Sequence, residues 1–289
     1  MKRTALIWGV LGFVVWAAAL SHGQTAPASG AAPAPKRPPQ AKTQAEYDAW
    51  KAAAANTDPA AQEKAADDFA AKFPDSELRI LLYKNATRSY QNANNAEKIE
   101  AMGRKVLTID GDDPEALTSV AEVIAERTRE SDLDKDQRYA EGLKLAQKAL
   151  QTADTDVIPP AGTTQQQLDA YKASLRSRDY SAIGTIQYNQ SNFADAQSSF
   201  QKAIDAVPSD PYSLDVLHLA LSLDKQGSAE ADRDKQMKLY AEALKVANRA
   251  VAMTQENTPI GTPARRERDR LLQLTGGTPA PAPNQPPKN

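Results

Sequence analysis

The sequence predicts an all-α protein, a solenoid in which antiparallel helix pairs stack on one another. The stretch 180–208 has the pattern of two short helices that are joined by a tight turn and stopped by Pro208. Residues 83–124 align with residues 180–221 without a gap, at an offset of 97 positions. Aromatic residues make up only 6% of the chain, and we find no period-2 alternation long enough for a strand.

We expect about eleven helices, whose ends are marked by proline, aspartate and asparagine. Asp58-Pro59 combines a good N-cap residue with proline at the first helical position, and the prolines outside the two terminal segments fall where helices start or stop. The proline-containing stretch 157–162 separates the sixth helix from a long seventh one. The expected helices cover residues 44–56, 59–73, 76–93, 95–110, 114–129, 135–153, 164–190, 193–206, 211–226, 232–254 and a last one that starts at Thr262-Pro263 and ends before Gly276.

The first residues of the chain resemble an export signal. Lys2 and Arg3 precede an apolar or small-residue run over 5–20, and small residues surround a possible cleavage point at Gly23–Gln24. We therefore expect export to the periplasm or the exterior of a bacterium. The alternative is an uncleaved anchor in the inner membrane formed by residues 5–20, although a spanning helix needs about 20 apolar residues.

Two segments rich in proline flank the helical part. Residues 24–42 and 276–289 hold ten of the nineteen prolines and few large apolar side chains. Such segments bury too little apolar surface to offset the entropy cost of ordering, so we expect flexible tails. The predicted organisation is a signal peptide (1–23), a linker rich in proline and alanine (24–42), a helical solenoid (43–275) and a proline-rich tail (276–289).

The helical part contains an internal duplication. Its two copies cover residues 80–154 and 177–255. Within them, residues 139–149 match residues 240–250 at an offset of 101, with seven of the eleven positions identical. Helical periodicity alone does not keep identities in register over such a distance, so we infer a duplicated block of four helices.

The best-preserved helix pair covers residues 177–210 and places bulky and small residues alternately on its two facing stripes. The residues that carry this pattern are Tyr180, Ile183, Gly184, Ala196, Phe200, Ala203 and the closing Pro208. The pattern resembles the tetratricopeptide (TPR) repeat, which implies a right-handed α-solenoid. Residues 80–113, 114–154 and 211–255 are similar but degenerate, the last two with charged insertions at 130–138 and 228–238, and 44–74 looks like one further pair.

The resemblance also implies where a partner would bind. In TPR solenoids the first helix of each pair lines a concave groove that takes a peptide or a partner helix. Carried over by register, the candidate groove residues are Lys84, Asn85, Arg88, Thr118, Ser119, Glu122, Ser181, Thr185, Tyr188, Asn189, Asp215 and Leu219. Some family members hold a C-terminal carboxylate with a lysine–asparagine clamp. Here Lys84 matches the lysine, but Arg88 stands where asparagine is expected.

Little in the sequence points to chemistry. The chain has no cysteine, its net charge is −2, and its thirteen glycines are scattered. These features argue against a thiolate site, a nucleic-acid surface and a phosphate-binding loop. His218 would be the sole histidine after signal cleavage, and its position suits a helix interface. We expect no catalytic residue, no cofactor and no metal site.

The function that fits these features is a non-enzymatic scaffold or adaptor of the bacterial cell envelope, which binds a protein or peptide partner in its groove. One alternative is a membrane-anchored assembly or secretion factor that keeps its N-terminal apolar segment. A less favoured one is an envelope enzyme that uses carboxylates on a helical scaffold, for which the sequence shows no paired acidic motif. The identity of the partner is not encoded in any motif.

Overall fold

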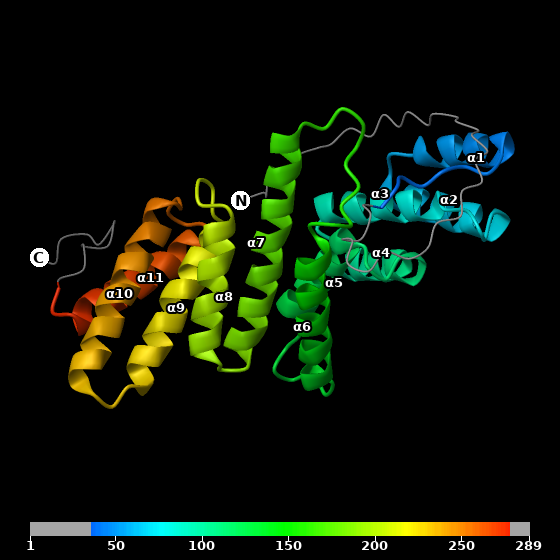
Figure 1. The fold of residues 1–289 in the computed structure, drawn as a ribbon. Coiled ribbons are helices and arrows are strands. Elements are labelled where there is room, and N and C mark those ends of the chain that lie inside the picture. Colours follow the sequence, from blue (N-terminus) through cyan, green and yellow to red (C-terminus); the bar gives the residue numbers. More distant parts are fainter. Residues whose placement is uncertain (1–35, 278–289) are drawn as a thin grey trace, which may run out of the picture. The chain divides into compact units, whose positions relative to one another are not determined.

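In a computed structural model the chain is described over residues 36–277, and this part is all-α with eleven helices (Figure 1). The helices are α1 (Gln44–Ala54), α2 (Pro59–Lys72), α3 (Arg79–Asn92), α4 (Ala96–Ile109), α5 (Pro114–Arg127), α6 (Lys135–Thr152), α7 (Gln165–Asn189), α8 (Phe193–Ala206), α9 (Ser213–Ala229), α10 (Arg233–Ala252) and α11 (Gly261–Leu274). The predicted all-α class is confirmed. The expected signal peptide, most of the expected linker and nearly all of the C-terminal tail lie outside the described residues.

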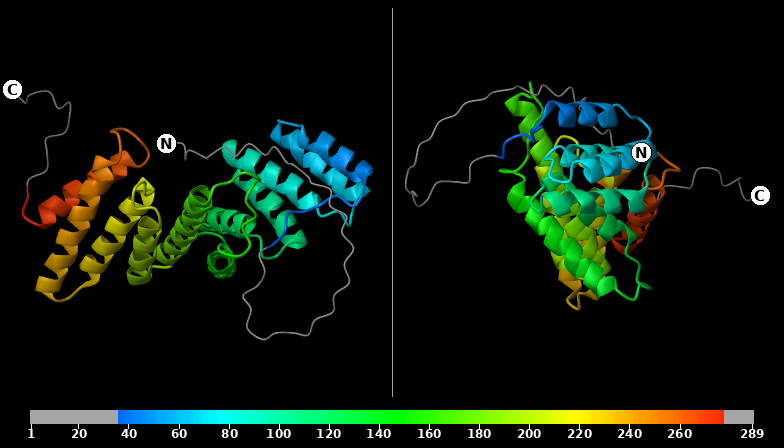
Figure 2. Two further views of the ribbon diagram at one scale, coloured as in Figure 1. Left: turned by 45° about the horizontal axis from the view of Figure 1, so that its top comes forward. Right: turned by 90° about the vertical axis from the view of Figure 1, so that its right-hand side faces the viewer.

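The chain divides into two compact units, each with its own core. We call residues 36–176 the N-terminal unit and residues 177–277 the C-terminal unit. Helix α7 contributes its first part to one unit and its second part to the other. Within each unit, helices that follow one another in sequence pack against one another, as in an α-solenoid (Figure 2).

The starts of several helices follow the capping signals in the sequence. The side chains of Asp58, Asn95 and Asp113 accept hydrogen bonds from backbone N–H groups of the first turns of α2, α4 and α5. Pro59 and Pro114 occupy the first helical position, where no N–H group is needed. These caps fix where each helix begins and therefore which residues face the neighbouring helix.

The core of the N-terminal unit is formed by large side chains of one helix set against small ones of the next. Trp50, Phe69, Met102 and Val106 are among its buried residues. Gly103 allows α4 and α5 to approach closely, because a Cβ atom at this position would lie only 2.7 Å from a methyl carbon of Val120. The pair formed by α1 and α2 packs onto this core, as the pattern of residues 44–74 predicted.

The core of the C-terminal unit is rich in alanine. Ala243, Ala247 and Ala250 form a fully buried stripe on α10. Phe200 and Leu223 supply much of the apolar volume in the same core. Small residues on one helix let the large side chains of its neighbour pack close to the backbone, which explains the high alanine content of this segment.

The turns between paired helices repeat at the predicted offset. Helices α4 and α8 are both 14 residues long and begin 97 residues apart. The tight turn before each helix contains a residue in the left-handed region, Asn94 with φ 53° and Ser191 with φ 63°, again 97 positions apart. Non-glycine residues rarely adopt this conformation, so its recurrence supports a true duplication of the local structure.

One side-chain contact also recurs in both copies. The Lys105 ammonium lies 5.2 Å from the ring centroid of Tyr83, and the Lys202 ammonium lies 5.6 Å from that of Tyr180. Each pair joins the first helix of a repeat to the second. The duplication therefore preserves a cation–π contact as well as the helix boundaries.

The connection in the second charged insertion is shorter than the expected helices left for it, whereas the first connection, residues 128–134, is slightly longer. Helix α9 continues to Ala229, and only residues 230–232 separate it from α10. Gly227 lies against the Tyr240 ring, and the Asp232 side chain accepts hydrogen bonds from the N–H groups of Asp234 and Lys235. Helix packing and capping thus extend both helices into the charged stretch.

Residues 36–42, the end of the expected linker, make specific contacts with the N-terminal unit in the structure.

In the sequence from 36 to 277, no helix has both the length and the apolar character needed to cross a membrane.

Candidate functional site

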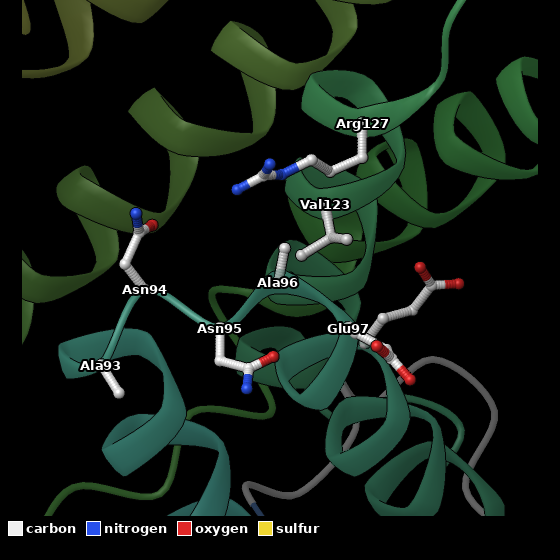
Figure 3. A pocket seen from close by; sticks show the side chains of 8 residues that line it. Ala93, Asn94, Asn95, Ala96, Glu97, Val123 and Arg127 are labelled. Carbon is white, nitrogen blue, oxygen red and sulfur yellow. The ribbon is translucent and has the colours of Figure 1, made fainter.

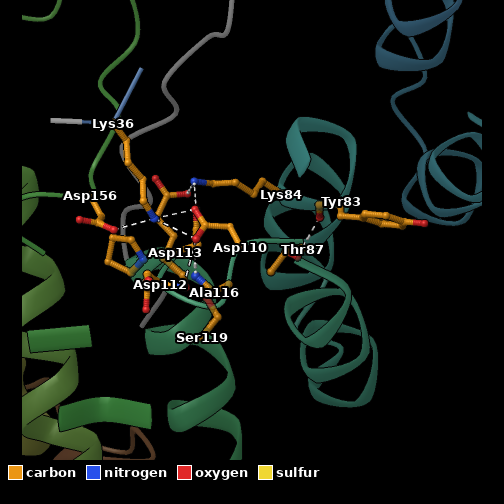
Figure 4. Close-up of polar contacts among 12 residues, drawn as sticks. Lys36, Tyr83, Lys84, Thr87, Asp110, Asp112, Asp113, Ala116, Ser119 and Asp156 are labelled. Carbon is orange, nitrogen blue, oxygen red and sulfur yellow. Dashed lines mark hydrogen bonds and ion pairs between the residues drawn. The ribbon is translucent and has the colours of Figure 1, made fainter. Parts of the chain in front are cut away.

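Charged side chains of α3, α5 and α7 meet on the N-terminal unit, in a cluster that we call the Lys84 network (Lys84, Arg88, Asp113, Glu115 and Tyr171). Lys84 Nζ lies 2.8 Å from Asp113 Oδ2 and 3.2 Å from Glu115 Oε2. Arg88 binds the same oxygen of Glu115 at 2.8 Å. Figure 4 shows the Lys84 side chain reaching Asp113 at the start of α5. The two cations of the predicted groove thus hold a carboxylate of the same chain.

The network has a strong effect on its central carboxylate. Burial by itself would raise the pKa of Glu115, but Lys84, Arg88 and a hydrogen bond from Tyr171 hold that pKa far below its usual range. Burial likewise opposes the charge of Lys84, yet Glu115 and Asp113 leave its pKa raised. Lys84, Arg88 and Glu115 are therefore charged at neutral pH, and with Asp113 they form an internal ion cluster.

The other predicted residues of this unit differ widely in exposure. Asn85 and Glu122 are half-buried, whereas Thr118 and Ser119 are buried. The Thr118 hydroxyl donates to the carbonyl oxygen of Pro114 at 2.8 Å, a local hydrogen bond within α5. Ser119 also contacts the neighbouring helix, because its Oγ accepts a hydrogen bond from the side-chain amide of Gln91 at 2.9 Å. Both side chains are therefore buried in internal contacts, and only Ser119 connects two helices.

The predicted residues of the C-terminal unit also fall into exposed and buried sets. Thr185 is half-buried and Asn189 is exposed. Asp215 and Leu219 are buried, and Leu219 belongs to the apolar core. Ser181 donates a hydrogen bond to Asp215 at 2.5 Å, so this pair joins α7 to α9. Fewer of the predicted residues on this unit are therefore accessible to a partner than the repeat register suggested.

Tyr188 is the large side chain of this surface. Its half-buried ring stacks on the imidazole of His218, with centroids 5.9 Å apart, and meets Phe193 edge-on at 5.3 Å. Phe200 also packs against His218, with ring centroids 5.1 Å apart. Burial lowers the pKa of His218 to about 4, so the imidazole is neutral at physiological pH. His218 is a helix-interface residue in the structure, as its position in the sequence suggested.

Two carboxylates and one guanidinium lie together where α9 meets α11. Asp224 and Glu267 are both buried, and Arg270 forms ion pairs with each of them. Burial raises the pKa of Glu267, and the nearby charge of Asp224 raises it further, while Arg270 opposes both effects. The same carboxylates contribute to a raised pKa of Tyr188, after burial of its ring. This acidic pair therefore borders the Tyr188 surface.

Sequence reasoning missed Glu115 and Glu267, the two carboxylates with the clearest pKa shifts in these clusters. Glu115 lies in the first turn of α5, 31 positions after Lys84, and a repeat register alone could have indicated that pairing. For Glu267, the available signal in the sequence was its spacing of three residues from Arg270 on the same expected helix.

An open hollow of about 590 Å³ lies between the α3–α4 turn and α5 in the N-terminal unit. In Figure 3 Ala96 and Val123 lie near its centre, with Arg127 on one side and Glu97 on another. The sequence analysis selected none of its lining residues. The hollow combines an apolar floor with charges of both signs, and the structure gives no further sign of a ligand there.

Among residues 36–277, no group of three or more histidine or acidic side chains is arranged so that it could hold a metal ion. Comparison with models of known protein families and with curated protein sequences finds no match to this chain.

Proposed function

We propose that this chain is a TPR-like protein-interaction scaffold, and that its two units use the first-helix faces of their repeats to bind protein or peptide partners. The observation that carries this proposal is a contrast between the two copies of the duplicated block. Their helix boundaries and turn conformations are retained, as α4 and α8 and the turns at Asn94 and Ser191 show. By contrast, the side chains on the outward face of the first helix of each pair differ between the two copies.

The contrast can be followed position by position. Lys84 of the first copy corresponds to Ser181 of the second, and Arg88 corresponds to Thr185. A cluster of ion pairs is thereby replaced by uncharged polar groups beside the Tyr188 ring. A surface that served only to keep the protein in solution would need neither the ion cluster nor the aromatic ring. We infer that the two units recognise chemically different segments.

Tyr188 is the strongest anchor for such a segment. Tyrosine is enriched in protein interfaces because it offers a large, rigid contact area and a polar tip. Thr185 and Asn189 flank it on α7 and supply hydrogen-bonding groups. A peptide or a helix lying along this surface would gain apolar contact and orientation from three neighbouring side chains.

Site-specific photocrosslinking in cells tests this proposal. A photoreactive amino acid placed at Thr185 or Asn85 should give adducts with one or more other proteins. The matched control is the same substitution at Lys245, an exposed residue on α10, the second helix of its pair. Equal adducts at all three positions, or none at Thr185 and Asn85, would contradict the proposal.

We also propose that the scaffold is exported to the bacterial cell envelope. Support comes from the charged, apolar and small-residue regions that follow one another over residues 1–24. Mass spectrometry of the protein from its native source tests this directly. A mature N-terminus at or near Gln24 supports export with cleavage, whereas an intact Met1 in the membrane fraction supports the anchored alternative.

A further inference from the structure

The segment before α1, residues 36–42, lies against the N-terminal unit, and we call it the N-terminal strap. Its first residue, Lys36, places Nζ 2.8 Å from both carboxylate oxygens of Asp110 and 2.6 Å from Asp156 Oδ2. Figure 4 shows the Lys36 side chain between these two residues. Burial opposes the charge of Lys36, but the two carboxylates leave its pKa raised. One lysine of the strap thus joins the α4–α5 loop to the loop after α6.

The rest of the strap is held by the α2–α3 loop. The Arg37 guanidinium forms two parallel hydrogen bonds with the Glu77 carboxylate, at 2.6 and 2.7 Å. The backbone N–H of Gln40 donates to the same carboxylate at 3.1 Å. Lys42 Nζ donates to the carbonyl oxygen of Asp75 at 2.9 Å. The hydrogen bond from Arg37 is the largest cause of the lowered pKa of Glu77.

The backbone of the strap is extended, and its sequence explains why. Pro38 and Pro39 fix φ near −65° and remove two backbone donors, which favours an extended chain. Ala41 packs against the apolar core of the unit at the point where the strap meets α1. The strap is therefore held through its three cations Lys36, Arg37 and Lys42, the backbone N–H group of Gln40 and the packing of Ala41.

The surface beneath the strap is a row of three carboxylates, Glu77, Asp110 and Asp156, which we call the acidic edge. They come from the loops before α3, before α5 and before α7. In a stack of helix pairs, alternate loops lie along the same edge, so the repeat architecture brings the three together. Two cations of the strap form ion pairs with all three carboxylates: Lys36 with Asp110 and Asp156, and Arg37 with Glu77.

We propose that the acidic edge is a binding site for an extended, basic, proline-containing segment of another protein, and that the strap occupies this site within the chain until such a segment displaces it. Charge complementarity and the fit of the strap itself define the ligand: a lysine and an arginine followed by two prolines. This surface is separate from the first-helix faces, so the inference goes beyond the scaffold function and does not depend on it.

Competition with the strap sets the affinity that a partner needs. Because the strap continues directly into α1, its effective concentration at the acidic edge is on the order of 1 mM. If the same segment binds as a free peptide with a Kd of about 100 μM, the strap would weaken its binding about tenfold. A partner succeeds when it binds more tightly than the strap or when the ion pairs of the strap are weakened.

The test uses the full chain with the strap charges reversed, Lys36→Glu and Arg37→Glu, and a fluorescent peptide with the sequence of residues 36–42. Fluorescence anisotropy at low salt should show binding to this variant at least tenfold tighter than to the wild-type chain. Adding Asp110→Lys and Asp156→Lys should abolish binding, and a peptide with glutamate at the positions of Lys36 and Arg37 should not bind. Circular dichroism verifies that each variant keeps its helix content.

Each result decides the proposal. Equal binding of the peptide to the wild-type chain and to the strap variant would overturn it, because the strap would then not compete for the site. Continued binding after the acidic edge is reversed would also overturn it. A last peptide, with glycine in place of both prolines, should bind more weakly because a flexible segment loses more entropy. Failure here leaves the photocrosslinking test of the first-helix faces unaffected.

Discussion

The Phe200 ring lies directly on the backbone of Gly184. A Cβ atom at Gly184 would come within 2.9 Å of two ring carbons of Phe200, closer than real Cβ contacts. In the first copy the same two positions hold Thr87 and Gly103. There the close contact of the glycine is with Val120 of α5, so the two copies use their small residue at different helix contacts.

This contact predicts the effect of a single added methyl group. Gly184→Ala should lower the stability of the protein by about 1–3 kcal/mol, because the surrounding core is fully packed and Phe200 has little room to move. Thermal unfolding followed by circular dichroism would measure the change. Gly111→Ala is the control, since a Cβ there meets its nearest atom at 3.7 Å. A loss of stability as large at Gly111 would contradict the packing explanation, and Phe200→Leu should partly rescue Gly184→Ala.

The Lys84 network predicts a defined dependence of stability on pH. The folded-state pKa of Glu115 is depressed, so its contribution is present above the unfolded-state pKa of about 4.3 and is lost as the pH falls below it. Glu115→Gln should cost about 2 kcal/mol at pH 7, less than the loss of a fully buried pair, because Lys84 keeps Asp113. The loss should shrink as the pH falls from about 4.3.

Denaturant unfolding from pH 3 to pH 7 would measure this dependence. A matched control is Asp68→Asn, which removes an exposed pair with Lys64 on α2 and should change the stability by less than about 0.5 kcal/mol at any pH. An effect of Glu115→Gln that does not vary with pH would show that the ion cluster is not its cause.

The buried acidic pair of the C-terminal unit predicts the opposite trend. The folded-state pKa of Glu267 is raised, so its contribution is favourable below the unfolded-state pKa and is lost as the pH rises through the folded pKa. Asp224, Arg270 and Lys225 are the charged groups that act on it. Glu267→Gln should therefore raise the melting temperature at pH 8 and leave it nearly unchanged at pH 4. A lower melting temperature at pH 8 would show that the ion pair with Arg270 outweighs burial.

The recurring cation–π contact predicts two related but unequal effects. Lys202→Met should cost about 0.5–1 kcal/mol, the usual value of such a contact near the surface. Lys105→Met should cost more, because Lys105 Nζ also lies 2.6 Å from Asp67 Oδ1. Adding Asp67→Asn to the Lys105→Met variant should cost little more. Equal effects of the two lysine substitutions would mean that the ion pair contributes nothing measurable.

Periodicity and self-similarity were sufficient to predict the helices and their order. The offset of 97 follows from identities such as Tyr83 with Tyr180, and the structure repeats the turn residues and a cation–π pair at that same offset. The end of α9 was predicted three residues too early, because the helix continues to Ala229 while Gly227 packs against the Tyr240 ring. Polarity alone does not reveal where a helix that packs in this way ends.

The candidate groove was harder to predict, since register assigns a side chain to a helix face but not to a partner. Thr118 and Ser119 bond to backbone carbonyls within α5, and Asp215 bonds to Ser181 across two helices. Lys84 finds its counter-ions 29 and 31 positions later in the chain. Such distant pairs depend on the stacking of repeats, which a pattern read along one helix does not contain.

The strap also has a mechanical consequence. A stack of helix pairs is elastic, because each repeat contacts only its neighbours and small rotations between repeats add up along the stack. Lys36 and Arg37 link the loops before α3, α5 and α7, and so they connect three successive helix pairs along one edge. With the strap in place the N-terminal unit resists extension along this edge, and a partner that removes the strap makes the unit more compliant.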